Sequence, residues 1–94
     1  MSTADPSKLR QRLEVLLSKL GRFDTDLQAD FTSLDARWSQ LDQVWDGIAY
    51  QEFVAHWSGV RSQIQQYVSM SKKYEQFLSE RIAALEKVER TGGI

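Results

Sequence analysis

The chain contains no cysteine, and His56 is the only histidine among its 94 residues. Without cysteine there is no disulfide framework and no thiol chemistry. A single histidine, with only Glu52 four residues before it, does not supply a metal site. A glycine-rich phosphate loop, a nucleophile elbow and paired catalytic carboxylates are absent too. The sequence therefore predicts no catalytic residue, no metal site and no cofactor, and we expect a protein that is not an enzyme.

Proline and glycine are nearly missing from two long segments of the chain. Pro6 is the only proline, and Gly21 and Gly59 are the only glycines within residues 6–44 and 48–90. Helix formers dominate both segments, and the period-two alternation of strands does not occur. The composition therefore predicts an all-α fold with helices over about 6–44 and about 48–90.

Long apolar runs are also absent. No stretch approaches the roughly 18 apolar residues that a membrane-spanning helix needs. The segment Met1–Pro6 is polar and lacks the basic and apolar regions of a signal peptide. We expect a protein that is made in the cytoplasm and that, if it is exported, leaves without a cleaved signal peptide.

Asp5 and Pro6 predict where the first helix begins. Aspartate is a favoured N-cap, and proline is well tolerated at the first helical position because its missing N–H would have no partner there. Downstream, Asp24, Asp26 and Asp30 lie on the same helical pattern without the glycine that an ion-binding loop needs. We therefore predict that these three carboxylates form a solvated acidic face.

Apolar residues recur every three or four positions in both segments, as in a heptad seam with one extra four-residue step from Leu27 to Phe31. The first seam comprises Leu9, Leu13, Leu16, Leu20, Phe23, Leu27, Phe31, Leu34, Trp38, Leu41 and Trp45. The second seam comprises Phe53, Trp57, Val60, Ile64, Tyr67, Ser71, Tyr74, Leu78, Ile82 and Leu85.

Further apolar residues flank the seams, at Leu17, Val44, Val54, Val68, Phe77 and Val88. A seam with a second row beside it is typical of a four-helix bundle. With 41% hydrophobic residues, the chain has more apolar surface than a two-helix hairpin can cover by itself. We therefore predict an antiparallel helix-turn-helix hairpin that dimerises into a four-helix bundle, with both seams forming the hairpin and dimer contacts.

The net charge is −1, which argues against nucleic acid as a partner. The charge is unevenly distributed: residues 6–23 carry +4, residues 24–66 carry −5 and residues 67–94 carry +1. Two antiparallel copies place unlike charges side by side, so charge favours an antiparallel homodimer while apolar burial supplies the affinity. Two alternatives remain open. One is a heterodimer with a sister protein, and the other is contact of anionic lipid with the bases Lys8, Arg10, Arg12, Lys19 and Arg22.

The chain bends at Trp45-Asp46-Gly47, between the two helical segments. Glycine permits backbone conformations that are costly for other residues. Asp46 is positioned to cap the second helix, where its charge also suits the helix dipole. Trp45 ends the first seam and is predicted to pack over the mouth of the hairpin.

These features together resemble the WXG-100 family of small type VII secretion substrates. The chain has a similar length, two amphipathic helices, and Trp-X-Gly at its midpoint, followed by the apolar residues Ile48, Ala49, Phe53 and Trp57. The resemblance implies a hairpin that dimerises with itself or with a sister WXG protein. It implies export of the folded dimer by a secretion ATPase, with Trp45, Asp46 and Gly47 as part of the recognition surface.

The chain departs from that family at its C-terminal side. Many members carry Tyr-x-x-x-Asp/Glu as a secretion element, but here Ser71 follows Tyr67 at that spacing and Leu78 follows Tyr74. Three explanations stay open: a partner supplies the signal, the chain uses a different signal, or it is not secreted. The alternative functions are an intracellular helical adaptor or coiled-coil scaffold and a membrane-active effector.

Overall fold

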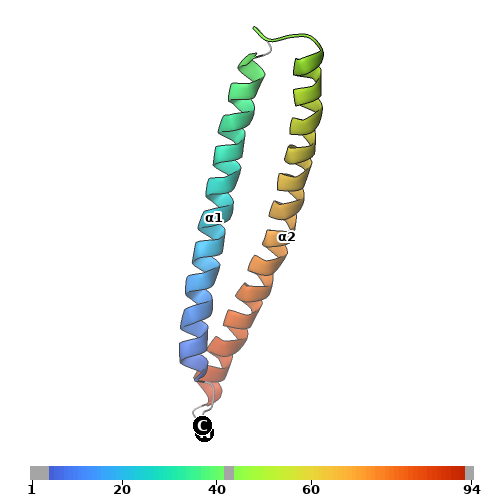
Figure 1. The fold of residues 1–94 in the computed structure, drawn as a ribbon. Coiled ribbons are helices and arrows are strands. Elements are labelled where there is room, and N and C mark those ends of the chain that lie inside the picture. The colour runs from blue at the N-terminus through green and yellow to red at the C-terminus, as the bar shows by residue number, and fades with distance from the viewer. Residues whose placement is uncertain (1–4, 42–43, 93–94) are drawn as a thin grey trace. The chain divides into compact units, whose positions relative to one another are not determined.

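The computed structural model describes residues 5–41 and 44–92 (Figure 1). Helix α1 spans Pro6–Leu41 and helix α2 spans Ile48–Gly92, and α2 runs back along α1. No strand occurs in these described residues. The predicted all-α hairpin is therefore confirmed. Helix α1 was predicted to reach about residue 44; it is described as far as Leu41, and residues 42 and 43 lie outside the described part.

The start of α1 is capped as the sequence predicts. Asp5 Oδ1 accepts hydrogen bonds from the backbone N–H groups of Ser7, at 3.0 Å, and Lys8, at 3.4 Å. The backbone carbonyl of Asp5 accepts the first helical bond, from Leu9 N at 3.0 Å. Asp5 is therefore the N-cap, and Pro6 occupies the first helical position without losing a hydrogen bond.

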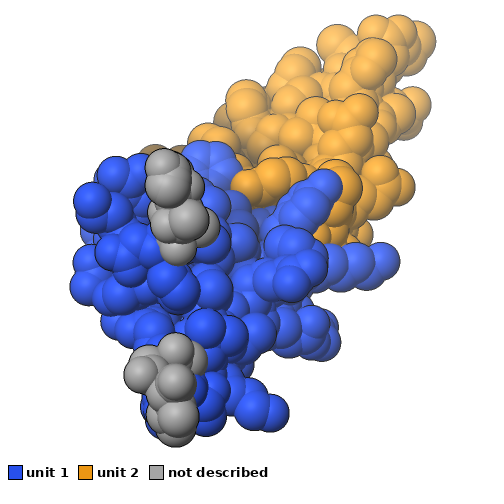
Figure 2. Space-filling model, turned by 90° about the horizontal axis from the view of Figure 1, so that it is seen from below, with its two compact units in different colours: residues 1–23, 71–94 blue, residues 24–70 orange. Residues whose placement is uncertain are grey.

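The hairpin consists of two compact units, coloured separately in Figure 2. Unit 1 comprises residues 1–23 and 71–94, and unit 2 comprises residues 24–70. Each unit pairs one segment of α1 with one segment of α2. The division follows the charge: unit 1 has ten bases and six acids, whereas unit 2 has two bases and seven acids. Unit 1 thus carries +4 and unit 2 carries −5.

The turn in unit 2 depends on Gly47. Its φ of +93° lies in the region that favours glycine, and it is the N-cap of α2, because its carbonyl accepts the Gln51 N–H at 3.1 Å. The sequence assigned this cap to Asp46, whose side chain has no hydrogen bond to the described residues. Position 47 must adopt a positive φ and also begin α2. A residue with a Cβ adopts this φ only at a cost in free energy.

Alanine substitution at two glycines is expected to have opposite effects on stability. Gly47→Ala should lower the free energy of unfolding by about 1 kcal/mol, because alanine is strained at this positive φ. Gly59→Ala should raise it by about 0.5–1 kcal/mol, because Gly59 lies inside α2 and a Cβ there meets no atom within 4 Å. Urea unfolding of both variants at one protein concentration measures the two changes. Equal effects at both positions would contradict this account of the turn.

Burial divides the predicted seams into two sets. Most seam residues are half-buried within the hairpin, and Ile82 and Ser71 are buried, at 8% and 2% exposed. Six others are exposed in the single chain, at 39% to 58%: Leu9, Leu16, Phe23, Leu34, Val60 and Tyr74. The hairpin therefore uses only part of the apolar surface that the periodicity assigned to it.

Asp24 corrects both the seam and the predicted acidic face. It is only 3% exposed, whereas its neighbour Phe23 is 56% exposed. The inward series at this point is therefore Leu20, Asp24, Leu27, with steps of four and three, and Asp24 takes the inward place that was predicted for Phe23. The buried carboxylate has a partner on α2, because the Tyr67 hydroxyl donates to Asp24 Oδ1 at 3.0 Å. Asp26 and Asp30 are exposed, as predicted.

Two variants of this polar contact should shift stability in opposite directions. Tyr67→Phe removes a donor from a buried carboxylate and is expected to cost about 1–3 kcal/mol. Asp24→Leu combined with Tyr67→Phe replaces both partners by apolar groups at an inward heptad position, and should raise stability above that of the unmodified chain by about 1 kcal/mol. Thermal and urea unfolding compare the three proteins. A double variant less stable than Tyr67→Phe alone would show that the contact stabilises the fold on balance.

Candidate recognition site

Trp45 packs against the first turns of α2. Its ring lies 5.5 Å from that of Tyr50, edge to face, and 5.8 Å from that of Phe53. The backbone N–H of Trp45 donates to Leu41 O at 2.7 Å, which joins the turn to the end of α1. Trp45 is half-buried, whereas Asp46 and Gly47 are exposed. Of the three predicted recognition residues, one is thus anchored in unit 2 and two are presented on its surface.

Further aromatic rings continue from Phe53 along unit 2. Trp38 of α1 lies 4.4 Å from Phe53 and 6.0 Å from Trp57, and Trp57 stacks on Phe31 at 5.1 Å with an angle of 8° between the rings. Offset and tilted ring pairs of this kind stabilise beyond the area they bury. The aromatic contacts hold the α1 and α2 segments of unit 2 together beside the turn.

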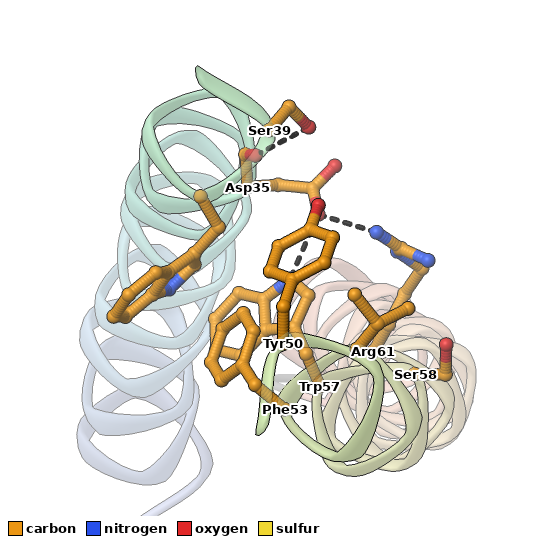
Figure 3. Close-up of a pocket in the computed structure, with 9 residues that line it drawn as sticks. Asp35, Ser39, Tyr50, Phe53, Trp57, Ser58 and Arg61 are labelled. Carbon is orange, nitrogen blue, oxygen red and sulfur yellow. Dashed lines mark hydrogen bonds and ion pairs between the residues drawn. The ribbon is translucent and has the colours of Figure 1, made fainter. Parts of the chain in front are cut away.

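A polar contact that the sequence did not predict crosses unit 2 at Asp35. Asp35 Oδ1 accepts a hydrogen bond from Trp57 Nε1 at 2.8 Å and forms an ion pair with Arg61 (Figure 3). The hydrogen bond from Trp57 and then that from Arg61 lower the pKa of the Asp35 carboxyl below its ordinary value. Ser39 Oγ donates to the backbone carbonyl of Asp35 at 3.0 Å. The carboxylate therefore links α1 to two successive turns of α2.

The same residues border a small hollow of about 110 Å³. Figure 3 shows the Arg61 guanidinium facing the Asp35 carboxylate, with dashed lines from this carboxylate to Arg61 and Trp57. The hollow is lined by Asp35, Trp38, Ser39, Tyr50, Phe53, Val54, Trp57, Ser58 and Arg61. Three of these, Trp38, Phe53 and Trp57, are seam residues. The sequence therefore predicted apolar side chains of the hollow but not the polar side chains that line it.

The Asp35 contact predicts a pH-dependent share of stability. Because the pKa of Asp35 is lower in the folded chain, its contribution is present above the ordinary value of about 3.9 and is lost as the pH falls through the folded value. Asp35→Asn should therefore be less stable near neutral pH, and its melting temperature should fall less than that of the unmodified chain between about pH 5 and about pH 2. Asp30→Asn, at an exposed carboxylate, is the control. Parallel pH profiles for all three proteins would contradict the expected effect.

Exposed apolar side chains gather on one face of unit 1. Leu9, Leu16 and Phe23 are seven residues apart on α1 and share one side of that helix. On α2, Phe77 and Val88 are also exposed. Leu9 meets Val88 in an apolar groove of about 420 Å³ that is also lined by Leu13, Arg81, Ala84 and Leu85. We call Leu9, Leu16, Phe23, Phe77 and Val88 the apolar face of unit 1.

Metal sites, membrane spans and similarity to known proteins were considered for the described part of the chain as well. Within residues 5–41 and 44–92, no group of three histidine, cysteine or acidic residues is placed to hold a metal ion. None of the described helices is long and apolar enough to cross a membrane. Comparison with family models, curated proteins and solved structures found no match to this chain.

Proposed function

We propose that the chain is a small non-enzymatic protein of the WXG type, exported in folded, dimeric form by a type VII secretion machine. Trp45, Asp46 and Gly47 form its recognition turn. The observation that carries the proposal is the construction of this turn. Gly47 adopts a positive φ, and Trp45 packs on Tyr50 and Phe53, and these contacts favour the observed conformation of residues 45–47 in the single chain. Preorganisation of this kind lowers the entropic cost of recognition.

The proposed partner in the dimer is a second copy of the chain, laid antiparallel. The five large apolar side chains of the apolar face of unit 1 are each about half exposed, and contiguous exposed apolar side chains often mark a protein–protein contact. The opposite charges of the two units favour contact between unit 1 of one copy and unit 2 of the other. A sister WXG protein with the same charge division would fit the same face.

Because the chain has no cysteine, single cysteines report the orientation of the copies directly. Leu9→Cys, on the apolar face of unit 1, should give no disulfide-linked dimer alone, whereas Leu9→Cys mixed with single cysteines in unit 2 should give mixed disulfides. Rapid crosslinking of Leu9→Cys with itself would indicate a parallel dimer and reject the antiparallel arrangement.

Export is tested in the producing cells, with and without a functional secretion ATPase of the type VII kind. The expected result is intact, unprocessed protein in the culture supernatant only when the ATPase is present. Protein retained in the cells in both strains would favour the alternative function, an intracellular helical adaptor or scaffold. Equal release from both strains, without release of a cytoplasmic marker protein, would point to another export route and reject the proposal.

A further inference from the structure

The N-terminal segment of α1 carries a row of bases on its outer side. Lys8, Arg12, Val15, Lys19 and Arg22 follow one another at steps of four, three, four and three residues, so they form one stripe along the helix. All five are exposed, and Val15 lies with Lys19 and Arg22 along one shallow depression of the surface. We call these five residues the basic stripe.

The basic stripe points away from the hairpin. Leu13 and Leu17 are half-buried against α2, and Val15 lies two residues from each of them. Two residues correspond to roughly 200° around an α-helix, so Val15 is on the opposite side from the packed face. The stripe is also separate from the apolar face of unit 1, which continues from α1 onto α2. A second copy that covers the apolar face therefore leaves the basic stripe accessible.

The four bases of the stripe have no ion pair among the described residues. The only acid of residues 6–23 is Glu14, and it pairs with Arg10 at 3.0 Å. Arg10 is held a second time by Glu89 of α2. Within residues 6–23, Arg10 is the one base outside the basic stripe, and intramolecular ion pairs neutralise it. The positive charge of the basic stripe stays uncompensated.

We propose that the basic stripe is a docking surface for anionic lipid headgroups. Its bases are spread along one line of a helix, which suits a flat anionic surface, and Val15 supplies an apolar side chain at the centre of the line. Lysine and arginine side chains along one side of a surface helix attract it to anionic headgroups. A nucleic acid duplex fits less well, because its phosphate backbone offers no apolar region for Val15 at the centre of the stripe. This inference does not depend on export.

The test is co-sedimentation of the full chain with vesicles of phosphatidylcholine, with or without phosphatidylglycerol. The stripe variant carries Lys8→Gln, Arg12→Gln, Lys19→Gln and Arg22→Gln. The control variant carries Lys72→Gln, Lys73→Gln, Lys87→Gln and Arg90→Gln, which remove the same charge from exposed positions of unit 1 on α2. Circular dichroism and sedimentation velocity on the same samples verify folding and oligomeric state.

The expected result is binding only to vesicles with phosphatidylglycerol, weakened by rising salt. A base near an anionic surface contributes about fivefold in affinity, so the stripe variant should bind at least about thirtyfold more weakly and the control only a few-fold more weakly. Three outcomes would overturn the proposal. They are no binding to anionic vesicles, equal weakening in both variants, and dissociation of the oligomer by the stripe variant alone, which would make the stripe an interface between copies. Tighter binding to duplex DNA than to anionic vesicles would overturn it as well.

Discussion

Trp45→Ala is expected to lower export of the protein by about thirtyfold while the chain stays helical and dimeric. A tryptophan at the centre of a recognition surface typically contributes 2 kcal/mol or more, which corresponds to this factor. Trp45 lies between α1 and α2 in the sequence, and among the described residues it contacts Tyr50 and Phe53 in the first turns of α2 and donates to Leu41 at the end of α1. Its removal therefore changes the turn surface and leaves the helices in place.

The comparison that measures this effect is the ratio of secreted to cellular protein for each variant. Met70→Ala serves as the matched control, because Met70 is a large, exposed apolar residue of unit 2 that lies outside the turn. Circular dichroism and sedimentation verify that both variants are folded and dimeric. Normal export of a folded Trp45→Ala protein would remove the turn from the recognition surface and with it the main support for the proposed function.

The second large effect is expected from a charge placed on the apolar face of unit 1. Leu16 and Phe77 are 51% and 53% exposed in the single chain, and we expect both to be covered in the dimer. Leu16→Asp with Phe77→Asp would force two carboxylates to be desolvated without partners, so the dimer dissociation constant should rise by at least about a hundredfold. The separated chains should retain much of their helix, because neither residue is buried within the hairpin.

Sedimentation equilibrium over a dilution series measures this dissociation constant. Val15→Asp with Gln76→Asp is the control. It adds the same charge one residue before Leu16 and one residue before Phe77. Both positions are exposed and lie outside the apolar face of unit 1. The two double variants should differ strongly in their dissociation constants. Equal constants, or an unmodified chain that remains monomeric at high concentration, would reject the four-helix bundle.

Much of the hairpin could be predicted because its determinants are local. Asp5 and Pro6 start α1 through a side chain and a ring that act within one turn of helix. Gly47 marks the reversal because few other residues tolerate its backbone conformation. The place where the chain reverses was therefore located from the sequence, although the cap of α2 was assigned to Asp46 and is made by Gly47.

The polar contacts of unit 2 could not be predicted in the same way. Asp35 meets Trp57 and Arg61 across 22 and 26 residues of sequence, and Asp24 meets Tyr67 across 43. Such pairs depend on how far α2 is shifted along α1, and no local pattern records that shift. The only sequence feature that pointed to these contacts was a carboxylate one helical turn from seam residues. A carboxylate at that spacing is equally typical of a solvated helix face.

The amino-acid sequence alone determined the two helices, their order and the place where the chain reverses, because spacing, capping and glycine act over a few residues. The tertiary structure decided which residues face inward. Phe23 and Asp24 both lie near the edge of the apolar stripe, and only the rotation of α1 against α2 turns Asp24 toward Tyr67 and Phe23 outward. That rotation minimises the free energy of all the contacts between the two helices at once, so it could not be read from one helix.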